Sequence, residues 1–209
     1  MSSVAEQLSQ LRMVPVVVID DPAAARPMAE ALLAGGIGCA EITLRTPAGI
    51  EAIREAAKVD GFLVGAGTVL SPGQVDECVD AGARFIISPG LDSDVVAQAR
   101  TREVAVIPGV ATATEVQHAL RLGLSLLKVF PVGALGGPKL LNALAAPFPD
   151  VRFVPSGGVS LANAADYLGV PSVAAISGSW LTPRSALAYG DFAEIERLAR
   201  ATASMLAAS

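Results

Sequence analysis

Two charged residues, Glu41 and Lys128, stand inside short apolar runs of the sequence, where a charge is unexpected. Glu41 belongs to the run Cys39–Thr43 and Lys128 to the run Leu126–Val129. Burying an unpaired charge is costly, so both side chains need partners. One interpretation is a buried structural ion pair. The other is an amine that attacks a ketone to form a Schiff base, with the carboxylate moving protons, because desolvation favours the neutral form of a lysine.

Two further side chains near glycine or apolar segments could bind an organic acid. Arg45 follows the run that contains Glu41, and its planar guanidinium suits a carboxylate. A surface salt bridge is the alternative for this arginine. Thr68 closes the segment Gly65–Thr68 and offers a hydroxyl. That segment lacks the Gly-x-Gly-x-x-Gly spacing, so a dinucleotide-binding loop is not supported.

Two other glycine-containing segments could bind an anion through backbone N–H groups, without Lys or Arg. Ordinary turns are the alternative for both. The segments are Pro155–Val159, which holds Ser156, Gly157 and Gly158, and Ile176–Trp180, which holds Gly178 and Ser179.

The remaining candidates for chemistry are weaker. Lys58 ends a helical stretch and is expected in solvent, whereas Lys139 stands near a helix start and could support an anionic substrate. The single histidine, His118, makes a histidine-rich metal site improbable, so no metal is predicted. Cys39 and Cys78 have no metal or redox spacing and are expected to be buried, reduced thiols.

Apolar, strand-like runs alternate with Ala-, Leu- and Glu-rich stretches at helical spacing. Such an alternation predicts parallel strands covered by helices on both faces. The expected strands are Val14–Ile19, Cys39–Thr43, Phe62–Gly65, Phe85–Ser88, Ala105–Pro108, Leu126–Val129, Arg152–Pro155 and Ala174–Ser177. The expected helices include Val4–Leu11, Ala23–Ala34, Pro72–Ala81, Thr112–Leu122, Leu161–Leu168 and Phe192–Leu206.

Eight strand–helix units without a long linker predict an α/β fold of the (β/α)8 TIM barrel type, with Val4–Leu11 as an extra N-terminal helix. A doubly wound open sheet is the alternative. One domain is expected over residues 1–209. In a barrel, strands two and six lie opposite each other and feed the same interior layers, so Glu41 and Lys128 could meet across the axis. The segments at 155–159 and 176–180 would then follow strands seven and eight, where barrels often bind phosphate.

The composition narrows the function classes. The chain is 52% hydrophobic and 17% charged, with a net charge of −5. These values argue against disorder. The negative net charge also argues against binding to nucleic acid or an anionic membrane, because both need clustered Lys and Arg side chains. The sequence has neither a secretory signal pattern nor an apolar run long enough to span a bilayer. A cytoplasmic protein is therefore expected.

Taken together, these motifs resemble the 2-keto-3-deoxy-6-phosphogluconate (KDPG) aldolase family along nearly the whole chain. The matching segments are Val14–Val16, Glu41–Arg45, Gly65–Val69, Ser88–Gly90, Ile107–Gly109, Lys128–Pro131, Pro155–Gly158 and Gly178–Trp180. The resemblance implies a trimeric, metal-independent class I aldolase on a (β/α)8 barrel, without a cofactor. Its substrate would be a phosphorylated keto acid, cleaved to pyruvate and glyceraldehyde 3-phosphate, with 4-hydroxy-2-oxoglutarate as a possible second substrate.

The same resemblance implies a role for each candidate residue. Lys128 would form the Schiff base and Glu41 would be the general acid–base. The substrate-binding residues would be Arg45 and Thr68 at the pyruvate carboxylate, Pro89 and Phe130 as pocket walls, and Ser156, Gly157, Gly158, Gly178 and Ser179 at the phosphate end.

Three other functions stay open at this point. Phosphogalactonate aldolases share the scaffold but usually have Glu-Ile-Pro-Leu-Asn where this chain has Glu41-Ile-Thr-Leu-Arg45. The lysine segment and Ser156 also depart from the pattern of many family members, which leaves the sugar stereoselectivity open. A phosphate-binding barrel isomerase or epimerase would use the same two glycine segments, and a non-catalytic sugar-phosphate sensor would have no evident need for the Lys128–Glu41 pair.

Overall fold

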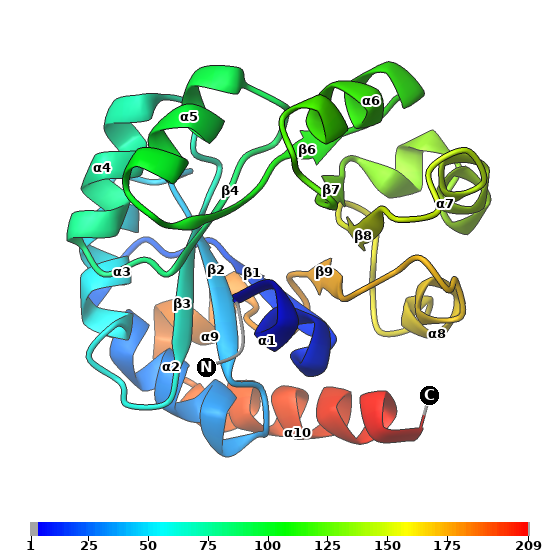
Figure 1. The fold of residues 1–209 in the computed structure, drawn as a ribbon. Helices are drawn as coiled ribbons and strands as arrows, with labels where there is room; N and C mark the ends of the chain where they lie inside the picture. Colours follow the sequence, from blue (N-terminus) through cyan, green and yellow to red (C-terminus); the bar gives the residue numbers. More distant parts are fainter. Residues whose placement is uncertain (1–3, 209) are drawn as a thin grey trace.

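Parallel strands alternate with helices along residues 4–208, the part of the chain that the computed structural model describes (Figure 1). The strands are β1 (Met13–Val17), β2 (Cys39–Thr43), β3 (Leu63–Gly67), β4 (Phe85–Ile87), β5 (Ala105–Ile107), β6 (Gly109–Val110), β7 (Leu126–Val129), β8 (Arg152–Pro155) and β9 (Ile176–Gly178). The α-helices are α1 (Val4–Leu11), α2 (Ala25–Ala34), α3 (Gly49–Ala56), α4 (Pro72–Asp80), α5 (Ser93–Thr101), α6 (Ala113–Arg121), α7 (Pro138–Ala145), α8 (Ala164–Leu168), α9 (Arg184–Tyr189) and α10 (Phe192–Ala208). Short 3-10 helices cover Pro22–Ala24 (η1) and Val132–Leu135 (η2). The predicted α/β fold with parallel strands and an N-terminal helix is confirmed.

The strands form two parallel sheets. Six strands are ordered β5-β4-β3-β2-β1-β9, and three are ordered β6-β7-β8. The strand predicted over Ala105–Pro108 is observed as β5, which ends at Ile107, and Pro108 separates it from β6, a short strand that the sequence did not predict; proline cannot donate a ladder hydrogen bond. Its carbonyl nevertheless accepts a hydrogen bond from the Lys128 N–H at 2.9 Å. At the other edge of the smaller sheet, Phe153 of β8 pairs in parallel with Val173, shortly before β9.

Buried side chains form an interior cluster and an outer cluster. The interior cluster joins alternate residues of the strands, such as Val14, Phe85 and Val154, and α1 inserts Leu8 into it. The residues between them, such as Ile42 and Phe153, pack outward against the helices. The two clusters are separate because successive side chains of a strand point to opposite faces. Glu41 lies two residues after Cys39, a member of the interior cluster, so its side chain also points into the interior.

Capping residues set several helix ends as the sequence predicts. The Ser71 hydroxyl accepts a hydrogen bond from the Gln74 N–H at the start of α4, and Thr112 and Glu115 form a reciprocal capping box on α6. The expected helix Leu161–Leu168 is wrong at its start, because α8 begins only at Ala164. Asn163 explains the difference: its side-chain oxygen accepts from the Ser160 N–H and its amide donates to the Gly158 carbonyl, which holds residues 161–163 in turns.

Smaller boundary differences occur at β1 and α2. The first strand covers Met13–Val17 instead of Val14–Ile19, and the helix expected over Ala23–Ala34 begins with the 3-10 turn η1 before α2. No helix within residues 4–208 is long and apolar enough to cross a membrane.

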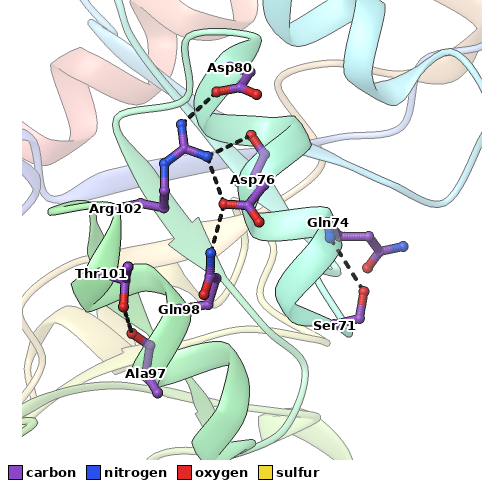
Figure 2. Close-up of polar contacts among 8 residues, drawn as sticks. All are labelled: Ser71, Gln74, Asp76, Asp80, Ala97, Gln98, Thr101 and Arg102. Atoms are coloured by element: carbon purple, nitrogen blue, oxygen red, sulfur yellow. Dashed lines mark hydrogen bonds and ion pairs between the residues drawn. The ribbon is translucent and has the colours of Figure 1, made fainter.

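A polar network connects α4 to the end of α5 (Figure 2). Arg102 donates to Asp76 at 2.7 Å and to Asp80 at 2.5 Å, and Gln98 also donates to Asp76, at 2.8 Å. The hydrogen bond from Arg102 and then that from Gln98 lower the pKa of Asp76. This network fixes neighbouring helices outside the strands and contains no residue of the candidate site.

Candidate active site

A buried ion pair joins Glu41 on β2 to Lys128 on β7. Lys128 Nζ lies 3.1 Å from Glu41 Oε1, although the two residues are far apart in the sequence. The exposed fraction is 0% for Glu41 and 6% for Lys128. The ammonium also lies 5.5 Å from the centre of the Phe130 ring, within reach of a cation–π interaction. The structure therefore brings together the two charges that the sequence singled out.

Gly67 on β3 makes room for the Glu41 carboxylate. A Cβ atom added at Gly67 would lie 2.2 Å from Glu41 Oε1, a distance that real Cβ contacts do not show. On the pairing of β2 with β3, Glu41 lies opposite Gly65 and Thr43 opposite Gly67. The carboxylate leans toward the carboxyl end of β3, where Thr68 begins the next loop.

The ion pair lies in a cavity of about 470 Å³ at the carboxyl ends of the strands. This volume is in the range of small-molecule sites. All eleven residues that the sequence nominates line this one cavity: Glu41, Arg45, Thr68, Pro89, Lys128, Phe130, Ser156, Gly157, Gly158, Gly178 and Ser179. The lysine and the glutamate thus open onto a space that is also lined by the Arg45 guanidinium and two glycine loops.

The Arg45 side of the cavity offers donors for an anion. Arg45 is exposed and forms no ion pair or hydrogen bond with any described residue, so the surface salt bridge considered for it is not found between residues 4 and 208. Thr68 has a positive φ of 58°. Left-handed backbone is unusual for a β-branched residue and marks a position held by its surroundings. Both residues line the same cavity as Lys128.

The opposite side is built from the loops after β8 and β9. Gly157 and Gly158 have φ values of 82° and 93°, a conformation that favours glycine. Their backbone N–H groups, and that of Ser179, donate no hydrogen bond to the described residues. The loop after β7 holds this loop in place, because Gly133 donates to the Gly157 carbonyl at 2.8 Å. Free, fixed N–H groups of this kind can bind a phosphate.

Three lining residues have no role in the sequence interpretation: Val16, Thr43 and Val159. Strand alternation could have found two of them, because Val16 and Thr43 face the same side as Val14 and Glu41. The Thr43 hydroxyl donates to the Val17 carbonyl at 2.8 Å, so it ties β2 to β1. Nothing in the residue type of Val159 indicates a site.

The other sequence candidates lie elsewhere. Lys139 is exposed at the start of α7 and does not line the cavity, His118 is exposed on α6, and Lys58 pairs with Glu55. Burial raises the pKa of the Cys39 and Cys78 thiols to about 12, with Glu77 adding to the shift at Cys78. Within residues 4–208, no group of three or more His, Cys, Asp or Glu side chains is arranged to hold a metal ion.

Comparison with known proteins gives a consistent result. The family profile described as "Aldolase: KDPG and KHG aldolase" matches residues 4–198. A 2-dehydro-3-deoxy-phosphogluconate aldolase from Pseudomonas aeruginosa is 46% identical over 192 residues, which are 91% of this chain and 87% of that protein. A KHG/KDPG aldolase from Escherichia coli K12 is 48% identical over 188 residues, 90% of this chain and 88% of that protein.

Solved structures agree with the sequence comparison. The KDPG aldolase of Legionella pneumophila, with pyruvate captured as a covalent carbinolamine intermediate, has a TM-score of 0.91 and 40% identity. The match covers 95% of this chain and 98% of that one. With a family profile and relatives of this identity spanning almost its whole length, this chain belongs to the KDPG and KHG aldolase family.

Proposed function

We propose that this protein is a class I aldolase that reversibly cleaves 2-dehydro-3-deoxy-6-phosphogluconate to pyruvate and glyceraldehyde 3-phosphate. The observation that carries the proposal is the buried Lys128 amine, 3.1 Å from the Glu41 carboxylate and open to the cavity. The names of the relatives and the pyruvate carbinolamine in the Legionella structure support it. Because some relatives are named KHG/KDPG aldolase, cleavage of 4-hydroxy-2-oxoglutarate to pyruvate and glyoxylate is included in the proposal.

The mechanism begins when Lys128 passes a proton to Glu41 and its neutral amine attacks the C2 ketone. The carbinolamine loses water with Glu41 as the proton donor, which leaves a protonated imine. The imine draws electrons from the C3–C4 bond, and this bond breaks as Glu41 takes the proton of the C4 hydroxyl. Glyceraldehyde 3-phosphate leaves, the enamine is protonated at C3, and hydrolysis releases pyruvate and the free amine.

The substrate would be held at its two anionic ends. Arg45 and the Thr68 hydroxyl would bind the carboxylate next to the ketone, since a guanidinium matches a carboxylate through two parallel hydrogen bonds. At the far end, the free N–H groups of Gly157, Gly158 and Ser179 would bind the phosphate. Pro89 and Phe130 would form apolar walls of the cavity around the substrate.

We further propose that the two sheets close into an eight-stranded (β/α)8 barrel. Only Pro108 separates β5 of the larger sheet from β6 of the smaller one, and Phe153 pairs with Val173 shortly before β9, so both junctions between the sheets support closure. A single domain over residues 1–209, a homotrimer and a cytoplasmic location are also parts of this proposal, and they rest on membership of the family.

Borohydride trapping tests the chemistry. Reduction in the presence of pyruvate should leave a stable adduct on Lys128, detected by mass spectrometry of the peptides. Lys128→Ala should lose both the adduct and turnover, and Lys128→Arg should not restore them, because a guanidinium stays protonated. Lys139→Ala, at an exposed lysine outside the cavity, is the matched control.

Two results would refute the Schiff-base proposal: an active wild-type protein without the adduct, or activity that disappears with a chelator. The substrate is tested separately, by comparing pyruvate release from 2-dehydro-3-deoxy-6-phosphogluconate with release from its C4 epimer. Faster release from the epimer would assign the chain to the galactonate series instead.

A further inference from the structure

The second carboxylate oxygen of Glu41 has no partner in the arrangement described above. Oε1 faces Lys128 Nζ, whereas Oε2 is buried and accepts no hydrogen bond from any residue between 4 and 208. A buried charged oxygen without a donor is costly. This oxygen therefore requires a donor that the ion pair does not provide.

Ser177 on β9 carries another buried polar atom without a partner. The residue is 0% exposed, and its Oγ forms no hydrogen bond with the described residues. Its strand neighbour Ile176 packs in the outer cluster, whereas Ala175, two residues before Ser177, packs in the interior cluster. Because side chains alternate along a strand, the Ser177 hydroxyl points into the interior that Glu41 occupies.

The strand register places Ser177 and Glu41 at the same level. Strand β1 lies between β9 and β2, with Val14 paired to Ser177 and Val16 paired to Glu41. In an eight-stranded barrel the strands tilt by about 36° with a shear of about one residue per strand. An offset of two residues across two strands therefore brings both side chains level. When β5 and β6 are counted as one barrel strand, β2, β7 and β9 are barrel strands two, six and eight. These even-numbered strands contribute Glu41, Lys128 and Ser177 to one interior layer.

We propose that one water molecule bridges the Ser177 hydroxyl and Glu41 Oε2, which makes Ser177 a positioning residue for the carboxylate that moves protons. The water donates one hydrogen to Oε2 and is fixed by Ser177, since buried waters settle where they find two or more polar partners. The bridge holds the carboxylate plane so that Oε1 stays directed at Lys128 and the substrate. This inference rests on the proposed aldolase function and on closure of the barrel.

The charged surroundings of Glu41 are simple enough for a pH profile to be interpreted. Lys128 faces it from β7, Arg45 lies at the rim of the cavity, and the Cys39 thiol lies two residues before it on β2. The inward positions of β1, β3, β4 and β9 carry no ionisable side chain. Loss of the Ser177 hydroxyl would thus change one hydrogen bond without removing a charge.

The experiment follows deuterium entry into the methyl group of pyruvate, measured by proton NMR in D2O over a range of pH. This half-reaction needs Lys128 and Glu41 but not the phosphate loops. Ser177→Ala should exchange about 10- to 100-fold more slowly, the range for losing a hydrogen bond to a charged group. The acidic limb of its pH profile should move to higher pH, because the carboxylate loses a donor that favours its ionised form.

Ser172→Ala is the matched control. Ser172 Oγ is also buried without a partner among the described residues, but the residue lies before β9 and so outside the interior layer that holds Ser177 and Glu41. Its exchange rate and pH profile should equal those of the wild type. A structural role for Ser177 alone would change the melting temperature of Ser177→Ala without moving the acidic limb.

A high-resolution crystal structure of the unmodified protein gives a second measurement that does not depend on folding of the variant. It should contain a water within hydrogen-bond distance of both Ser177 Oγ and Glu41 Oε2, and its absence would overturn the proposal. The same holds if Ser177→Ala exchanges pyruvate protons at the wild-type rate with an unmoved profile. Failure of the wild type to exchange or to form the borohydride adduct would instead refute the proposed function, so the two failures are distinguishable.

Discussion

Gly67 contacts the carboxylate of Glu41, and replacing it with alanine tests how closely catalysis depends on the position of that carboxylate. The added Cβ would lie 2.2 Å from Oε1, 2.5 Å from Cγ and 2.7 Å from Cδ. Ordinary contact begins at 3.4 Å, so the carboxylate must move by the difference, about 1.2 Å. From its present 3.1 Å, a shift of this size weakens or breaks the hydrogen bond to Lys128.

The expected loss follows from that displacement. Misplacing a catalytic group by about 1 Å costs roughly 100-fold in rate, which corresponds to about 2.7 kcal/mol in the activation barrier. Overpacking the interior should also lower the free energy of unfolding by about 1–3 kcal/mol. The assay measures kcat and KM for pyruvate release and the melting temperature by circular dichroism. We expect kcat to fall much more than KM rises, because the phosphate loops and Arg45 are untouched.

Gly73→Ala is the control for this substitution. Gly73 lies in the first turn of α4, and a Cβ there would meet nothing within 4 Å. Glycine to alanine at such a position should be neutral or stabilise by up to about 1 kcal/mol, with unchanged kinetics. If Gly67→Ala kept kcat within about threefold of the wild type and melted like Gly73→Ala, the carboxylate position would not limit the reaction, and the argument from the contact would be refuted.

Three further predictions concern backbone strain, thiols and surface charge. Thr68→Gly should raise the melting temperature, because the φ of 58° at this position suits glycine. The KM for the keto-acid substrate should rise, because the hydroxyl that would bind its carboxylate is lost. A lower melting temperature would show that the backbone at Thr68 is not strained. With thiol pKa values of about 12, Cys39 and Cys78 should resist iodoacetamide at pH 8 in the folded protein and react only after denaturation, as mass spectrometry can verify. Arg102→Ala should lower the melting temperature near pH 7, and the deficit should shrink below about pH 4, the range of an unfolded aspartate. The sign follows from the lowered pKa of Asp76: its contribution to stability is present above the unfolded pKa and is lost as the pH falls through the folded one. A deficit that stays constant down to pH 2.5 would show that Arg102 acts through packing alone.

The sequence predicted the charged centre well because burial makes charges conspicuous. A lysine and a glutamate inside apolar strands require each other, and the even strand numbers indicated that they could share an interior layer. The glycine loops after strands seven and eight were indicated by the rule that barrels place their sites at the carboxyl ends of strands, whereas Pro89 and Phe130 came only from the resemblance to the family. Element boundaries were less predictable where one side chain decides them, as Asn163 does at the start of α8.

Uncharged residues of the site were harder to predict, because nothing in their type marks them. The sequence interpretation treated Gly67 as part of a glycine-rich loop, whereas the structure gives it a steric role against Glu41. Ser177 passed unnoticed for the same reason, since a hydroxyl in an apolar strand is a modest cost when it can find a hydrogen bond. Both residues become informative only when register and alternation are combined, because β1 offsets β9 from β2 by the two residues that bring Ser177 level with Glu41. The alternation and register that place Glu41 and Lys128 in one interior layer place Ser177 there as well, so a bridging water would join the ion pair and this hydroxyl in one polar group.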